Sequence, residues 1–266
     1  MTIENVIEDG AFHSWRGFEP GEIQYAAYIH AKPEVIAAGH KIQDLYWSFC
    51  HARYTFLEAY DVASDSKENL FKITNLLSCA ILQYGLCYDL LWQIAWAAEM
   101  PTSFNLICDL ETEKLEKECT RESLEERIGC NISQNSSVAS QSWKLNQWLR
   151  SVDNDVSIVA LREIYNYIKH RGAIYYSELI ENQSPIVNVD LGNGISSGIK
   201  FPERKEYSIG RIKSLLIDYH FTLEKAINRL IEIVMPQDYK SVSVNGSTFL
   251  CTVVDVVNQQ QNGGVA

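Results

Sequence analysis

The sequence predicts a mainly α-helical protein: an up-and-down bundle of four or five long helices, with one small β-hairpin inserted near residues 186–201. Three observations support this fold class. Apolar residues recur every three or four positions over long stretches, which is typical of helices that bury one face. Prolines stand near the ends of these stretches. A hydrophobic content of 46% over 266 residues is enough for a packed core.

We divide the chain into an N-terminal arm (1–32), a helical bundle (33–236) and a C-terminal extension (237–266). The arm has no clean period, but its aromatic residues suggest that it packs on the core. The first long helix is predicted over 33–62, because Pro33 suits a first helical turn and an amphipathic pattern follows. Ser64-Asp65-Ser66 is expected to form a turn and the N-cap of the next helix.

The second long helix, predicted over 67–100, is apolar nearly all round, which favours the centre of the bundle. Asn75, Gln83, Asp89 and Gln93 interrupt it too often for a membrane span. Asp89 is costly to bury unless it is paired, so we expect a hydrogen-bond donor beside it.

The next part of the chain is more polar. Residues 109–128 are charge-rich and predict a solvated helix or helical pair, and the Ser/Asn-rich residues 131–142 predict a loop. A short helix through Trp143 and Trp148 should follow, and then a helix from about Asp155.

Beyond Gly172, the segment IYYSELI is expected to extend a broken helix. Alternating residues on both sides of a Gly-Asn-Gly turn predict the hairpin over 186–201. Ser208 should cap the cleanest helix, whose heptad seam suits antiparallel packing and which Pro236 ends. A second hairpin is possible over 240–257, followed by a mobile end. The residues of the seam are Ile209, Ile212, Leu216, Tyr219, Leu223, Ala226 and Leu230.

Composition narrows the possible functions. The net charge of −11 argues against broad nucleic-acid binding, so any basic surface must be local. Seven cysteines without a C-x-x-C pair, and no apolar leader, predict a cytoplasmic protein with reduced thiols. His40, Asp44 and His51 lie near one stripe of the first long helix, and their spacing would allow them to bind a metal together. Their simpler interpretation is a polar helix edge, so we expect no metal and no cofactor.

The stretch 161–172, LREIYNYIKHRG, contains the candidate chemistry. Arg162, Asn166 and His170 are spaced four residues apart, so they share one face of a helix. The structural alternative is a helix end in which basic residues complement the dipole and Gly172 forms the cap.

The string Asn166-x-x-x-His170 near a helix end, within an all-helical chain, resembles the signature of the HEPN superfamily. Together with the order of long helices, the resemblance extends over about 33–236. It implies a helical bundle that dimerises, and a metal-independent endoribonuclease of the defence or toxin type in which Arg and His of two protomers face each other. Cleavage without a metal needs a base and a cation for the developing phosphorane charge. The candidate residues are His170 as base or acid, Arg171 or Arg162 as phosphate clamp, Asn166 as orienting group, Lys169 as supporting cation, and Tyr165 and Tyr167 for binding a base.

Tyr165 stands where the family has an arginine, so a second function stays open. This alternative is a catalytically inactive HEPN-like module that binds a protein or small-ligand partner through the same groove. The tyrosines can stack on a base or pack in the core. RNA and a second copy of the chain are the expected partners, and neither DNA nor a membrane is expected.

Overall fold

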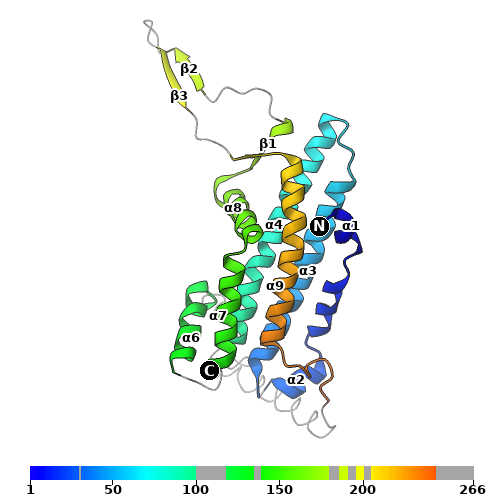
Figure 1. The fold of residues 1–266 in the computed structure, drawn as a ribbon, viewed down its shortest axis with the longest axis vertical. Coiled ribbons are helices and arrows are strands. Elements are labelled where there is room, and N and C mark those ends of the chain that lie inside the picture. The colour runs from blue at the N-terminus through cyan, green and yellow to red at the C-terminus, as the bar shows by residue number, and fades with distance from the viewer. Residues whose placement is uncertain are drawn as a thin grey trace, which may run out of the picture.

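A computed structural model describes residues 1–29, 31–99, 118–134, 139–179, 186–190, 196–200 and 205–243. The fold is mainly α with a small β-hairpin, as predicted. Three of its long elements are α3 (Pro33–Asp61), α4 (Lys67–Ala98) and α9 (Ile209–Val234), which lie along one another in the bundle (Figure 1). The fourth consists of two helices in succession, α7 (Ala139–Asp153) and α8 (Val156–Arg171), both packed against α9.

Side-chain caps fix where most of these helices begin. The hydroxyl of Ser66 accepts a hydrogen bond from the Asn69 backbone amide at 3.1 Å, and the hydroxyl of Ser208 accepts one from that of Arg211 at 3.2 Å. Such caps satisfy amides that have no partner within the helix. Pro33 occupies the first turn of α3, so the predicted starts of α3, α4 and α9 are confirmed.

The α9 seam packs within the chain. Leu216, Leu223 and Leu230 are fully buried, and α9 contacts α3, α4, α7 and α8. The apolar seam of α9 is therefore covered by other helices of the same chain.

The N-terminal segment is part of the core. It forms α1 (Ile3–Glu8), a 3-10 helix η1 (Ala11–Phe18) and α2 (Glu22–Tyr28), which lie against α3 and α9. Phe12 and Trp15 are each only 1% exposed, as expected for aromatic residues that pack on the bundle. Their burial covers the outer side of α3.

A largely buried polar chain links this segment to the bundle. The Tyr84 hydroxyl lies 2.8 Å from Nδ1 of His220, and Nε2 of the same ring lies 2.9 Å from Oδ2 of Asp9. His220 is 0% exposed and stands on α9, whereas Tyr84 stands on α4. Both imidazole nitrogens therefore have partners inside the protein.

Two sequence predictions need correction. The loop predicted over 131–142 is wrong at both of its ends, because α6 (Arg121–Ser133) continues into it and α7 begins at Ala139; residues 135–138 lie outside the described residues. The helix does not resume after Gly172. Instead β1 (Tyr175–Tyr176) pairs in parallel with β4 (Glu206–Tyr207), and a 3-10 turn η2 (Ser177–Leu179) follows β1.

The predicted hairpin is confirmed as an antiparallel pair, β2 (Ile186–Asp190) with β3 (Ser196–Lys200). Its Gly-Asn-Gly turn, residues 109–117 of the charged stretch and residues 244–257 of the second predicted hairpin lie outside the described residues.

Among the described residues, α4 alone is long and apolar enough to cross a membrane by length and composition. The buried core helix of a soluble protein passes the same test, and 44% of its most apolar window is buried here. In the bundle α4 packs against α3, α8 and α9.

Candidate functional site

The candidate motif lies on α8, and its two ends are held by local interactions. The carboxylate of Asp155 accepts hydrogen bonds from the backbone amides of Ser157 and Ile158 at the N-terminus. At the other end Gly172 adopts φ +118°, a left-handed conformation that favours glycine, and its amide donates to the Tyr167 carbonyl at 3.2 Å. The predicted glycine cap is therefore confirmed.

Three predicted site residues lie in the open at the C-terminal half of α8. Asn166, His170 and Arg171 are exposed, and no other described residue forms a hydrogen bond or ion pair with their side chains. The two basic residues lie in the last turn, where positive charge complements the helix dipole. They are accessible to a partner and are not sealed in the core.

Tyr165 is used in packing. It is 7% exposed, and its ring lies against Gly85 of α4 so closely that a Cβ on Gly85 would overlap it. Its hydroxyl donates a hydrogen bond to Oδ2 of Asp89 at 2.7 Å, and the Lys169 ammonium lies 3.8 Å from the same oxygen. Burial and the Asp89 carboxylate raise the pKa of Tyr165. The hydrogen-bond donor expected beside Asp89 is therefore the Tyr165 hydroxyl.

Arg162 is directed away from His170. Its Nη1 lies 3.6 Å from Oδ1 of Asp153, and its guanidinium carbon lies 4.2 Å from the centre of the Tyr88 ring. Eight residues of helix also separate Arg162 from His170, which is about 12 Å along the axis. The structure therefore does not bring these two side chains together within one chain.

Tyr167 is half-buried on the side of α8 that faces the β4 segment. The ammonium of Lys205 lies 5.9 Å from the centre of its ring and 3.6 Å from Oε2 of Glu163. These three residues form a small local cluster of their own on the surface of α8.

Asp153, at the end of α7, is the centre of a polar cluster that sequence reasoning missed. Its Oδ1 accepts a hydrogen bond from the Tyr88 hydroxyl at 2.6 Å, its Oδ2 accepts one from Nη2 of Arg121, and Arg162 is its third partner. Burial, and then the hydrogen bond to Asp153, raise the pKa of Tyr88 to about 12. Four helices, α4, α6, α7 and α8, meet at this carboxylate.

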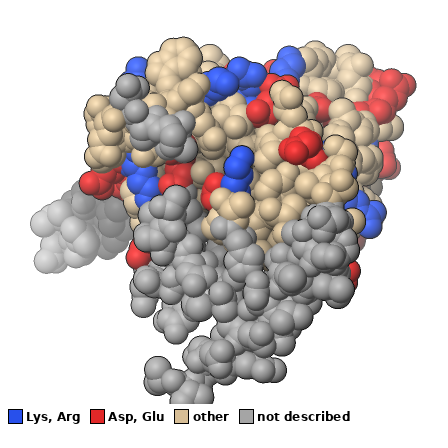
Figure 2. Space-filling view, turned by 90° about the horizontal axis from the view of Figure 1, so that it is seen from below, with Lys and Arg blue, Asp and Glu red and all other residues tan. Residues whose placement is uncertain are grey.

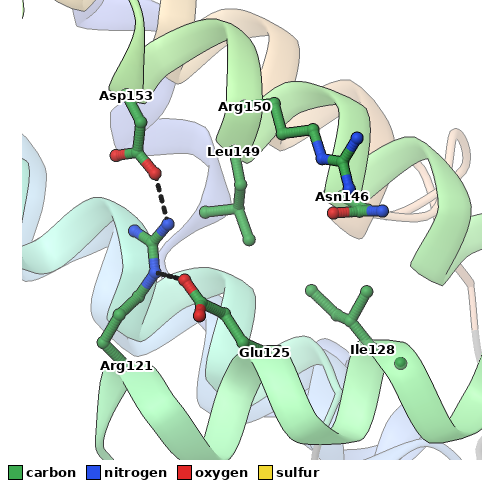
Figure 3. A pocket seen from close by; sticks show the side chains of 8 residues that line it. Arg121, Glu125, Ile128, Asn146, Leu149, Arg150 and Asp153 are labelled. Carbon is green, nitrogen blue, oxygen red and sulfur yellow. Dashed lines mark hydrogen bonds and ion pairs between the residues drawn. The ribbon is translucent and has the colours of Figure 1, made fainter.

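A cavity of about 390 Å³ opens beside this cluster, between α6 and α7 (Figure 3). Arg121 bridges Asp153 and Glu125 at one end, with its Nε 2.8 Å from Oε1 of Glu125. Arg150 and Asn146 lie at the other end, where no described residue forms a hydrogen bond with their side chains. The lining residues are Arg121, Glu125, Ile128, Gly129, Asn146, Leu149, Arg150 and Asp153.

The run Asp153-Asn154-Asp155 is the sequence signal that could have indicated the polar cluster. Its two acids have different roles, because Asp155 caps α8 and Asp153 binds the arginines. The partner Arg121 comes from a different helix, so spacing along the chain cannot reveal it.

The described residues contain no group of three His, Cys, Asp or Glu side chains that could hold a metal ion. His40 is instead 2.7 Å from the Tyr25 hydroxyl, and Asp44 pairs with Lys41 at 3.4 Å. In the coloured part of the surface that Figure 2 shows, basic and acidic residues are interspersed, without a broad area of one sign.

Comparisons with models of protein families, with curated proteins and with solved structures found no match. The resemblance to the HEPN superfamily therefore rests on the α8 residues and on the order of the long helices.

Proposed function

We propose that this chain is a HEPN-like cytoplasmic module that does not cleave RNA and that binds an anionic partner through the exposed end of α8. One observation carries the proposal. Arg162 is held by Asp153 and Tyr88, and position 165 is a tyrosine bonded to Asp89, so neither position supplies a guanidinium beside His170. Arg171 is the next residue along the chain, and neighbouring residues of a helix project from different faces, so its guanidinium does not face the same space as the imidazole. A metal-independent nuclease needs a cation to stabilise the developing phosphorane charge.

The binding role follows from what α8 leaves accessible. Asn166, His170 and Arg171 offer an amide, an imidazole and a guanidinium on the surface, without partners among the described residues. A guanidinium pairs well with phosphate, and an imidazole and an amide add hydrogen bonds. Because the whole chain carries a charge of −11, this contact must be local, which favours a short anionic segment.

Single-stranded RNA is the probe for this surface. We expect fluorescence anisotropy to show weak, salt-dependent binding that Arg171→Ala lowers, together with a salt slope reduced by about one. Arg229→Ala is the matched control, because Arg229 is 63% exposed on α9 and pairs only with Glu232 among the described residues. Equal affinity of the wild type and both variants would exclude α8 as the contact surface.

A second candidate is the metal-independent ribonuclease, assembled from two copies of the chain. The exposure of His170 and Arg171 favours it, since a second copy could place its own guanidinium opposite this imidazole. The dimer would use a surface other than the buried α9 seam.

Cleavage of RNA in excess chelator separates the two functions. The binding proposal expects no cleavage by the wild type, His170→Ala or Arg171→Ala. Wild-type cleavage that is lost in both variants, from a protein that sediments as a dimer, would replace the binding proposal with the nuclease.

A further inference from the structure

We propose that the cavity between α6 and α7 binds a small carboxylic acid with an apolar body, and that Arg150 and Asn146 hold its carboxylate. The site is separate from the exposed end of α8, so it stands whether or not α8 binds RNA. The cavity of about 390 Å³ is within the usual range of small-ligand sites, about 300 to 1,000 Å³.

One end of the cavity is already neutralised. The guanidinium of Arg121 donates to both Glu125 and Asp153, and Asp153 also receives the Tyr88 hydroxyl. With Arg162 beside Asp153, two carboxylates face two guanidinium groups there. This end therefore offers little net charge to a ligand (Figure 3).

The other end is not neutralised by any described residue. Arg150 and Asn146 lie four residues apart on α7, so their side chains share one helix face, and both line the cavity. The planar fork of an arginine matches the two oxygens of a carboxylate, and an amide N–H adds a further donor. One uncompensated positive charge fits a monoanion better than a doubly charged phosphate monoester.

The space between the two ends is open, and two apolar side chains form part of its wall. Leu149 and Ile128 are 4% and 3% exposed and lie between the polar groups in Figure 3. Gly129 also lines the cavity, and a Cβ added there would meet no other atom within 4 Å. A short hydrocarbon body could cover the two apolar side chains while the carboxylate stays at Arg150.

Calorimetric titration of the full chain with hexanoate, hexanamide and hexyl phosphate tests the proposal. We expect saturable binding of hexanoate that is at least about tenfold tighter than binding of the neutral amide, because a hydrogen-bonded charge is lost. Hexyl phosphate should bind more weakly than hexanoate. Arg150→Gln should weaken hexanoate binding about tenfold or more, whereas Arg229→Ala should leave it unchanged.

A second pair of variants tests the position of the ligand. Gly129→Leu places a side chain in the open space and should abolish binding, while circular dichroism and thermal unfolding show the fold retained. Gly210→Leu is the matched control, since Gly210 is an exposed helical glycine of α9 that also has no neighbour within 4 Å of an added Cβ. The proposal fails if wild-type protein shows no saturable binding at millimolar hexanoate, if neither Arg150→Gln nor Gly129→Leu weakens it, or if hexyl phosphate binds more tightly.

Discussion

Two histidines of this protein, His220 and His170, differ in burial and in hydrogen bonding. His220 is fully buried on α9, with Tyr84 at 2.8 Å on one ring nitrogen and Asp9 at 2.9 Å on the other. His170 is exposed in the last turn of α8 and has no hydrogen-bond partner among the described residues. The first is fixed by its surroundings and the second is free to meet a partner.

The difference shows that sequence position alone does not indicate what a histidine does. His170 belongs to a recognisable polar string, whereas His220 follows Tyr219 of an apolar seam and carries no motif. Burial with both nitrogens bonded gives a structural role, because breaking such a chain leaves unpaired groups in the core. Exposure without partners among the described residues leaves the His170 side chain accessible from outside the protein.

The largest expected effect in this comparison is the loss of His220. His220→Ala should lower the free energy of unfolding by about 3 kcal/mol or more, because the Asp9 carboxylate and the Tyr84 hydroxyl would lose their partner inside the protein. His170→Ala should change it by less than about 0.5 kcal/mol. Denaturant unfolding measures both, and similar losses in the two variants would contradict the contrast.

Two glycines provide a second test of buried against open surroundings. Gly85→Ala should destabilise the fold by about 1–3 kcal/mol, because the added methyl group overlaps the Tyr165 ring. Gly129→Ala should instead stabilise it by about 0.5–1 kcal/mol, since the methyl group enters open space within a helix. Thermal unfolding of the two variants should therefore shift in opposite directions. A stabilising shift in Gly85→Ala would show that α4 and α8 are packed less closely than described, and a destabilising shift in Gly129→Ala would show that the space beside Gly129 is not open.

Much of the fold could be predicted because its determinants are local. The period of α3, α4 and α9 and the caps at Ser66 and Ser208 can be read along the chain. The end of α6 and the start of α7 could not be predicted in this way, because their Ser- and Asn-rich residues are held by tertiary contacts. Asn131 and Ser142 both donate to the buried Glu99 carboxylate, at 2.6 Å and at 2.8 Å to the same oxygen.

The candidate site was only partly predictable for the same reason. The α8 string contains Asn166, His170 and Arg171, which the structure leaves exposed, but the directions of Arg162 and Tyr165 depend on Asp153 and Asp89 of other helices. The α6–α7 cavity requires two helices, one of which was expected to be a loop over part of its length.

A smaller effect is expected at the junction of α4 and α8. Tyr165→Phe removes the hydrogen bond to Asp89 but leaves Lys169 at 3.8 Å from the carboxylate, so we expect a loss of about 1 kcal/mol. Tyr54→Phe, at a tyrosine that is 70% exposed, is the control and should have almost no effect in the same unfolding assay. A loss equal to that of His220→Ala would mean that Lys169 does not compensate Asp89.

The smallest expected effect is a dependence on pH. Burial lowers the pKa of His220 below its usual 6.5, although the hydrogen bond with Asp9 opposes this, and Arg53 acts in the same direction as burial. Below about 6.5 the unfolded chain therefore takes up a proton that the folded chain does not, and the free energy of unfolding falls as the pH drops toward the lowered value. His220→Gln cannot titrate, so its disadvantage relative to the wild type should shrink between about pH 7 and 5. Parallel stability curves for the two proteins would contradict this.

The contact between Asp9 and His220 joins positions 211 residues apart, and this sets an order of events during synthesis on the ribosome. The first helix can meet Arg53 of α3 early, since that guanidinium donates hydrogen bonds to the carbonyls of Val6 and Ile7. The Asp9 carboxylate, however, stays solvated until His220 has been synthesised. Packing of α9 into the bundle is thus the step that joins α9 to the segment around Asp9. Contacts of such long range form late and slowly.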